Sequence, residues 1–533
     1  MGRPGAECGV HTPLSAESRT VTKTPHPGLA LLLVALLAML AVPAEASVNA
    51  FWKELGGSAT GGGVSQLSPP RGTGNGVDVT AGADGRPIVI YTDSTIGEDG
   101  RILAKRWTGT AWQMISPAAG INDPAIGGEE PQLVISPAGT FFAAWSTREL
   151  GGAQVHLRRR VGTSTVWEQL DNSDAPGGLT SLNGSNIFRF SLAVGDDELP
   201  VVAFEAPAQK PGIVSPVPGN VTGQHQIYVK KYMGPAQGWQ YLGPDPSGSG
   251  NTSAGGASEA VSFLVNGGGG YAQHSANTPS LVIDSAGRPN VAFVYTTSYP
   301  FGSAPEFVQG NGEIFVTRFD NGVWGPVGPA VPTGDSVAGR GGPGGLSNDP
   351  GASGAGSLAL SPTGVMWVTW HEASTTSGDS AIFVRRWNGT DTWEEVGGAS
   401  ASGGGISGLQ RNFAPRIGID ASELPIVAWQ NVFSAAVVFV ARFDGADWVE
   451  MGPDSASGDG VTGADASPMS LGVSSGTPQH CERRVARVRR RHLLPAGAPA
   501  PVLQRAELPV QRRHCAERKR PPRQRTHRHR LPR

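Results

Sequence analysis

Short apolar runs, separated by turns containing Gly, Pro or Asp, recur along most of the chain. In the unit that begins at Pro279 the four runs are LVI, NVAFVY, EIFVTRF and VWGPVG. The turn DSAGRP joins the first two runs and DNG joins the last two, and both are typical of tight turns between antiparallel strands. Because each run is short and ends at turn residues, the unit predicts four strands.

The unit recurs, with starts near residues 78, 131, 190, 279, 357, 415 and 468. Internal repetition of a four-stranded unit predicts an all-β fold, a β-propeller of four-stranded blades, over residues 47–479. The segment FWKELGG, which starts at Phe51, resembles a lone fourth strand. It can complete the blade opened by Pro468–Pro478, so we expect seven blades, with eight as the alternative and the last blade incomplete in this chain.

Two side-chain positions are constant among the units. A Trp opens the fourth run at Trp52, Trp112, Trp167, Trp239, Trp324, Trp393 and Trp448. A cation stands in the third run at Arg106, Arg159, Lys231, Arg318, Arg386 and Arg442. Because these residues repeat in every blade, we interpret the Trp as inter-blade packing and the cation as an ion-pair partner. A sugar-stacking role for the Trp is the alternative.

The N-terminal region has the pattern of a signal peptide. Leu29–Val42 is an uninterrupted apolar run followed by Pro43-Ala44-Glu45-Ala46, a cleavage site of the A-x-A type. The run is too short to span a membrane. We expect residues 1–46 to be removed, the product to be secreted, periplasmic or at the cell surface, and no membrane insertion after cleavage.

The composition divides the chain into two unlike parts. The formal charge of −2 combines residues 47–479, with 22 Lys and Arg against 38 Asp and Glu, and residues 480–533, with 17 against 3. An acidic body is a poor partner for nucleic acid. The 76 Gly and 43 Pro argue against long helices. No Cys lies between Cys8 and Cys481, so the predicted propeller has no disulfide.

The basic tail, residues 480–533, interrupts a unit and abolishes its pattern. We interpret it as the product of a shifted reading frame and expect it to be disordered. A genuine basic interaction tail is the alternative.

The repeat P-x-h-x-h-D-x-x-G-x-P-h-h-A-[FW], where h is apolar, with its I-x-V-x-R-[FW]-[DN]-G-x-x-W hairpin, resembles secreted bacterial propeller repeats. These belong broadly with NHL-type and sialidase-like propellers. The resemblance covers about residues 47–478 and implies the fold, but no single activity, because propellers carry many functions. The sialidase Asp-box S-x-D-x-G-x-x-W is only approximated by Asp284-Ser285-Ala286-Gly287.

Polar residues that differ between units end the second runs. They are Asp93, Ser146, Glu205, Thr296, His371 with Glu372, and Gln430. If these ends face one mouth of the propeller, the candidate binding residues are Asp93, Glu205, His371, Glu372 and Gln430. His371 and Glu372 are adjacent on a strand and should point to opposite faces, which argues against a direct proton relay. The alternative is that all of these are unconstrained residues at loop mouths.

The loops DNSDAPGG and GPDSASGDGVTGADAS offer oxygen ligands, but neither has a calcium-binding pattern. We predict no metal site, no cofactor and no catalytic residue, with Ca²⁺ as the alternative at these loops. The predicted function is a non-catalytic, monomeric binding scaffold for an extracellular glycan, peptide or protein. The alternative is an extracellular carbohydrate hydrolase or lyase with its site in the propeller funnel, and a fragment of a larger adhesin or enzyme is a third possibility.

Overall fold

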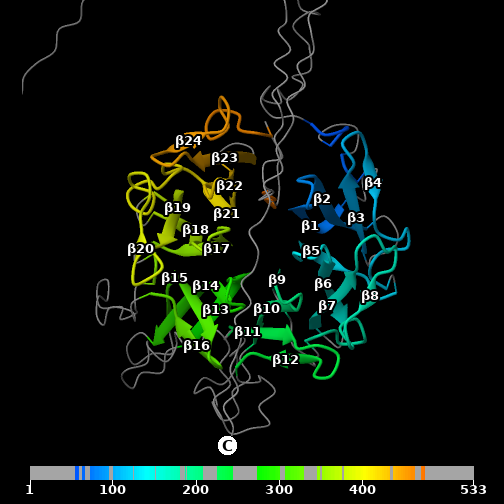
Figure 1. Cartoon of the computed structure of the whole chain (residues 1–533). Helices are drawn as coiled ribbons and strands as arrows, with labels where there is room; N and C mark the ends of the chain where they lie inside the picture. The colour runs from blue at the N-terminus through cyan, green and yellow to red at the C-terminus, as the bar shows by residue number, and fades with distance from the viewer. Residues whose placement is uncertain are drawn as a thin grey trace, which may run out of the picture. The chain divides into compact units, whose positions relative to one another are not determined.

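Six four-stranded antiparallel sheets make up the described part of the chain, and each runs from its first to its fourth strand in sequence order. The computed structural model describes residues 54–58, 63–65, 73–94, 100–123, 125–149, 152–180, 187, 189–207, 225–243, 273–300, 307–328, 345–347, 351–374, 377–432, 436–462 and 470–473. The first strands of successive sheets contact one another around a common centre, and the fourth strands lie outermost (Figure 1). These sheets are the blades of an all-β propeller.

The first blade is β1 (Thr73–Ala81), β2 (Pro87–Asp93), β3 (Arg101–Trp107) and β4 (Trp112–Met114), and the second is β5 (Glu129–Ile135), β6 (Phe141–Glu149), β7 (Gly152–Arg160) and β8 (Glu168–Gln169). The third is β9 (Phe190–Val194), β10 (Pro200–Pro207), β11 (His225–Tyr232) and β12 (Trp239–Tyr241), and the fourth is β13 (Gln273–Ile283), β14 (Pro289–Pro300), β15 (Phe307–Asp320) and β16 (Val323–Pro326). The fifth is β17 (Ser353–Leu360), β18 (Met366–Ala373), β19 (Ser380–Trp387) and β20 (Trp393–Glu394), and the sixth is β21 (Asn412–Ile419), β22 (Pro425–Asn431), β23 (Val437–Phe443) and β24 (Trp448–Glu450).

The prediction of seven or eight blades is wrong, because the described residues form six. The expected closing segment does not form a strand at its described residues, 54–58, and neither do the described residues of the last unit start, 470–473. A blade also needs second and third strands, and the sequence after Pro478 lacks their alternating apolar pattern. The physical reason for the lower number is therefore the loss of the strand pattern in mid-unit.

The signal peptide (1–46), the basic tail (480–533) with its expected disorder, and Trp52 lie outside the described residues. No helix in the described ranges is long and apolar enough to cross a membrane.

The predicted turns are present. In DSAGRP the amide of Gly287 donates to the carbonyl of Asp284 at 2.8 Å, and Gly287 has φ +75°, a conformation that glycine adopts without steric cost. In DNG, Asn321 and Gly322 have φ values of 51° and 84°, which is typical of the primed hairpin turns that match strand twist. Local turn chemistry thus determines where each blade folds back.

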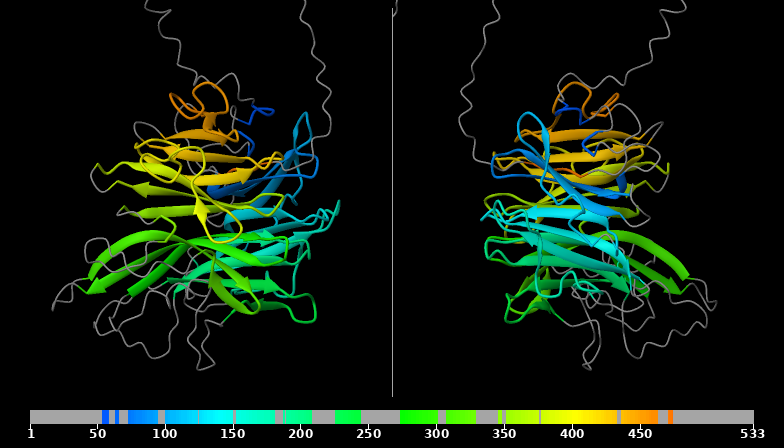
Figure 2. Two further views of the ribbon diagram at one scale, coloured as in Figure 1. Left: turned by 60° about the vertical axis from the view of Figure 1, so that its left-hand side comes forward. Right: turned by 90° about the vertical axis from the view of Figure 1, so that its right-hand side faces the viewer.

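The hydrophobic core lies between the blades. Phe142 and Leu157 of the second blade pack with Phe204 and Tyr228 of the third, and the other core clusters pair neighbouring blades in the same way. Figure 2 shows the sheets stacked face against face in chain order. Because both faces of a middle strand are covered, its burial is nearly continuous, which explains the imperfect alternation in the sequence.

In five of the six described blades, the repeated Trp bonds through its indole N–H to the segment that precedes its blade or to the preceding blade. The bonds run from Trp112 to Leu55 O (2.7 Å), Trp239 to Leu170 O (3.1 Å), Trp324 to Leu242 O (2.6 Å), Trp393 to Val327 O (2.8 Å) and Trp448 to Val396 O (3.0 Å). These five bonds confirm the packing interpretation. Leu55 stands three residues after Trp52, and the acceptors in the later blades also stand three residues after a repeated Trp. The segment around Leu55 therefore packs against the first blade in the same way that the end of a fourth strand packs against the blade that follows it.

In five of the six described blades, the repeated cation bonds to a side chain of its own blade. The bonds run from Arg106 to Asp84 (2.7 Å), Arg159 to Glu168 (3.2 Å), Lys231 to Asp197 (2.6 Å), Arg318 to Asn290 (2.7 Å) and Arg386 to Glu394 (2.8 Å). The cation therefore joins the third strand to a neighbouring turn or strand, as predicted.

A belt of side chains links the first strands around the centre. At one equivalent position in five of the first strands, and at Ser470, a side-chain oxygen accepts the amide N–H of the next first strand. The bonds run from Leu133 to Asp78 (2.9 Å), Leu192 to Gln132 (2.9 Å), Leu281 to Ser191 (3.0 Å), Leu358 to Ser280 (2.9 Å), Ile417 to Ser357 (3.4 Å) and Val79 to Ser470 (3.2 Å). Through Ser470, the segment Ser470–Val473 lies between β21 and β1 and connects the sixth blade to the first.

Candidate functional site

The second strands all end at one end of the ring. Each finishes beside the beginning of its own first strand, as the pairings Asp93↔Thr73, Ser146↔Glu129, Thr296↔Ser275, Glu372↔Ser353 and Gln430↔Phe413 show. In the third blade the amide of Glu205 donates to the carbonyl of Arg189 at 2.8 Å. We call this end of the ring the entry end. It carries all five candidate residues, which come from four different blades.

Asp93 is 1% exposed and forms an ion pair with Arg101 on the neighbouring strand. The Arg101 side chain is 20% exposed, so it covers the carboxylate. A buried charge of this kind needs such a partner to offset its desolvation. Asp93 is therefore engaged inside its own blade.

Glu205 combines burial with two directed contacts. One carboxylate oxygen lies 2.6 Å from Nδ1 of His225 on β11, and the other accepts the amide N–H of Thr278, in the fourth blade, at 3.2 Å. Glu205 is 4% exposed, whereas the His225 side chain is 20% exposed. The buried carboxylate thus orients a histidine ring that solvent reaches. His225 was not among the predicted site residues, because it opens a third strand and follows no repeated pattern.

His371 and Glu372 point to opposite faces of β18, as predicted. The His371 ring meets Phe413 of the sixth blade edge-on, with centroids 5.3 Å apart. Glu372 accepts the Trp370 indole N–H at 3.0 Å and the Ser353 hydroxyl at 3.3 Å. The two residues therefore do not form a direct proton relay.

The space beside His371 depends on a glycine. A Cβ at Gly354 would lie 2.6 Å from Cε1 of the imidazole, which is closer than real Cβ contacts. His371 Nδ1 is buried and has no hydrogen-bond partner among the residues that the structure describes. Burial lowers the pKa of His371 to about 4, because a charged ring would lose its hydration there.

This burial predicts a pH dependence of folding. The native state keeps His371 neutral down to a pH of about 4, whereas the unfolded chain binds the proton below about 6.5. The unfolded state thus holds more protons between these values, so the contribution to stability is complete above pH 6.5 and is lost as the pH falls toward 4. Between pH 7 and pH 4.5, the free energy of unfolding should fall by about 2 kcal/mol less in His371→Gln than in the parent chain. Urea titrations of both chains at the two pH values test this, and equal losses would contradict it.

Gln430 is half-buried and lies opposite Phe413. Beside it, the side-chain amide nitrogen of Asn431 donates to Gln410 Oε1 at 3.0 Å and to Asn412 Oδ1 at 2.8 Å. The sixth blade therefore has a hydrogen-bonded group of amides at the entry end, in which Asn412 and Asn431 are buried and Gln410 is exposed, where the sequence predicted only Gln430.

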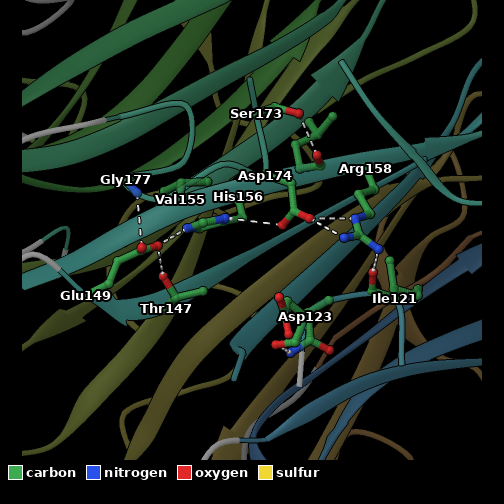
Figure 3. Close-up of polar contacts among 12 residues, drawn as sticks. Ile121, Asp123, Thr147, Glu149, Val155, His156, Arg158, Ser173, Asp174 and Gly177 are labelled. Atoms are coloured by element: carbon green, nitrogen blue, oxygen red, sulfur yellow. Dashed lines mark hydrogen bonds and ion pairs between the residues drawn. The ribbon is translucent and has the colours of Figure 1, made fainter. Parts of the chain in front are cut away.

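A buried charge cluster in the second blade was missed by the sequence analysis (Figure 3). His156, which is 1% exposed, lies between Glu149, at its Nε2, and Asp174, 3.3 Å from its Nδ1. Arg158 binds Asp174 through Nε at 2.7 Å and the carbonyl of Ile121, in a turn after the first blade, at 2.6 Å. The one sequence signal for this cluster is the position of Asp174 in the loop DNSDAPGG. That loop offers oxygen ligands and therefore indicated Ca²⁺ as an alternative, not an ion pair.

The cluster uses its carboxylates for ion pairs. Asp174 is bonded to both His156 and Arg158, and Glu149 lies at the other ring nitrogen of His156. Within the described ranges, no three or more His, Cys, Asp or Glu side chains are arranged to hold a metal ion. Asp174 thus serves the packing of its loop against β7.

No family model matches the chain, and no curated protein matches its sequence. Solved structures with a similar arrangement include an α-L-arabinanase of Penicillium chrysogenum (11% identity, TM-score 0.38, 71% of this chain and 95% of that one). Others are an ulvan lyase of polysaccharide lyase family PL25 (13%, 0.41, 71% and 84%) and a Hadza microbial sialidase (10%, 0.34, 68% and 67%). None of these structures tests the NHL-type part of the resemblance. At these identities and TM-scores no residue role or activity is carried over to this chain.

Proposed function

We propose that this propeller binds a saccharide at its entry end. The observation that carries the proposal is the set of polar side chains there, which are held by hydrogen bonds within their own blade or to the next one. The His225 ring and the Gln410 amide, which solvent reaches, supply donors and acceptors, and buried groups such as Glu205 and Asn431 hold them in place. Fixed groups of both kinds suit a ligand with many hydroxyl groups, because they are already oriented before binding.

A saccharide fits this end better than a protein partner does. Protein interfaces are usually anchored by aromatic or large apolar side chains at their core. In the described part of the chain, the exposed large hydrophobic residues are Val77, Met114, Val161, Val166, Met233, Val323, Leu409 and Met451. No aromatic residue belongs to that described set, and none of its members ends a second strand. Export, a monomeric state and the absence of nucleic-acid partners remain predictions from the sequence.

A second candidate function is enzymatic, as a hydrolase or lyase acting on the same saccharide. The observation that favours it is the contact between Glu205 and His225. A buried carboxylate 2.6 Å from Nδ1 holds that nitrogen as the donor, so the ring can accept a proton at Nε2. Both candidates place the ligand at the same end, and they differ only in whether a bond is broken.

Calorimetric titration of the full chain with soluble oligosaccharides of glucose, arabinose and glucuronic acid tests the proposal. We expect one series to bind and Glu205→Gln to weaken it at least tenfold, because the substituted amide no longer orients His225 as a charged acceptor does. Glu168→Gln, on the outer fourth strand, is the matched control and should bind as the parent does. If the Glu205 variant and the parent bind with equal affinity, the entry end is not the saccharide-binding site.

The same samples separate binding from catalysis. New reducing ends would indicate hydrolysis, and unsaturated ultraviolet-absorbing products would indicate a lyase. If the parent releases either product and His225→Gln binds without releasing it, the enzymatic candidate replaces the binding scaffold. Binding without any product supports the scaffold.

A further inference from the structure

One position of the belt around the centre departs from the others. Where the other first strands and Ser470 carry Asp, Gln or Ser as an acceptor, β21 carries Arg416, which has no acceptor atom. Its Nη1 donates to the carbonyl of Pro415 at 3.0 Å. No other hydrogen bond or ion pair of its guanidinium to a described residue is present. An arginine at this place weakens the belt, so its presence calls for another role.

A second arginine lies at the same end of the first strands. Two residues before each belt position the strands are irregular, with bulges in β1, β5, β13, β17 and β21. The residue there has positive φ in four blades, at Gly76, Glu130, Thr278 and Ala414. The equivalent residue of the third blade is Arg189. Arg189 directly precedes β9 and is exposed, and its side chain makes no hydrogen bond or ion pair to a described residue, although its carbonyl accepts the amide N–H of Glu205.

The two arginines come from blades three positions apart in the ring, yet their charges interact. Burial is the main cause that lowers the pKa of Arg416, and the charge of Arg189 lowers it further, while Asp78 opposes the change. Arg416 is enclosed by protein but keeps part of its surface open to solvent, as expected of a side chain that reaches toward the centre of the ring. Arg416 lies in β21 and Arg189 directly before β9, and because the first strands surround the common centre, both residues border that centre.

The nearby carboxylates do not neutralise this pair. Asp78 is engaged by the amides of Val79 and Leu133, each at 2.9 Å, and by the hydroxyl of Ser470. Burial raises the pKa of Asp78 and the pKa of Glu130, although Arg189 acts against the change at Glu130. Two arginines with unused donors, neither of them ion-paired to a carboxylate of a described residue, are a ready site for an oxyanion, which a guanidinium can bind through two parallel bonds.

We propose that Arg189 and Arg416 form an axial site for a carboxylate, and that the saccharide bound at the entry end carries this group as a uronic acid. This inference rests on the proposed function and adds the ligand class to it. The acidic body, with its formal charge of −16 over residues 47–479, repels dense polyanions at long range. A saccharide with isolated carboxylates therefore fits better than a densely sulfated one.

The test compares two matched oligosaccharides on the full chain. One is an oligomer of glucuronic acid, and the other is the glucose oligomer of the same linkage and length, which has CH₂OH in place of each carboxylate. We expect the acidic oligomer to bind at least tenfold more tightly, with a preference that falls as salt is added. Arg189→Gln and Arg416→Gln should each remove most of this preference and leave the neutral oligomer unchanged.

Two further variants keep the test decisive. Arg148→Gln removes a cation at the same end whose side chain is 78% exposed, and it should keep the preference. Arg416→Lys retains the charge without the planar fork and should give an intermediate preference. Urea titration of each variant separates loss of binding from loss of folding. Because Arg189 is exposed, its variant should fold as the parent does.

The outcomes distinguish this inference from the proposed function. Equal binding of both oligomers, sensitive to Glu205→Gln, overturns the carboxylate site and keeps the saccharide site. Binding of neither oligomer overturns both. If a peptide with a C-terminal carboxylate binds in an arginine-dependent way and the acidic oligomer does not, the assignment to a uronic acid is wrong.

Discussion

Replacing Trp393 with Ala is expected to lower the free energy of unfolding by about 3 to 5 kcal/mol. Trp393 is 5% exposed, packs against Trp387 with ring centroids 5.5 Å apart, and donates its indole N–H to Val327 O at 2.8 Å. The substitution opens a cavity between the fourth and fifth blades and leaves a buried carbonyl without its donor. Urea denaturation monitored by circular dichroism gives the change.

Phenylalanine variants separate packing from hydrogen bonding. Trp393→Phe keeps an aromatic ring but loses the bond to Val327. It should therefore lower the free energy of unfolding by about 1 to 2 kcal/mol more than the change in ring size alone would. Trp167 provides the matched control, because it fills the equivalent position, is 6% exposed, and has a buried indole nitrogen without a hydrogen-bond partner. Trp167→Phe should therefore lower the free energy of unfolding by less than Trp393→Phe does. If the two Phe variants cost the same, the inter-blade bond contributes nothing measurable.

Asp174→Ala is expected to lower the free energy of unfolding by about 3 kcal/mol, because it removes one partner from a buried charge cluster. The change leaves His156 with a single carboxylate and takes from Arg158 its bond to Asp174 (2.7 Å). Loosening of Arg158 should also weaken its contact with the carbonyl of Ile121, which follows the first blade. Urea denaturation measures the total effect, and hydrogen exchange of the loop 171–180 locates it.

A surface ion pair in the same blade provides the control for Asp174. Arg159 and Glu168 lie 3.2 Å apart, with side chains 38% and 50% exposed. Glu168→Ala should therefore cost less than about 1 kcal/mol, since solvent already screens that pair. If Asp174→Ala costs no more than Glu168→Ala, the cluster is not a stabilising feature of the second blade.

Most of the blade is predictable from sequence because its causes are local. Turn residues such as Gly287 and Asn321 select the hairpins, and short apolar runs between them form strands whatever surrounds them. The structural roles of the repeated Trp and cation could be inferred as well, because a residue present in every unit must serve what the units share. The number of blades could not be read in this way, since it depends on whether the segments at the two ends of the repeat array supply whole blades.

The axial and charged groups depend instead on which distant residues the ring brings together. Arg189 and Arg416 come from blades three positions apart, and only closure of the first strands around one centre places their charges within range of each other. His225 meets Glu205 through strand register, and Asp174 reaches His156 because its loop folds back over β7. The repeated pattern therefore specified the blades, where local turn and strand preferences decide. The candidate site arose from packing between blades, where contacts between residues far apart in the chain decide.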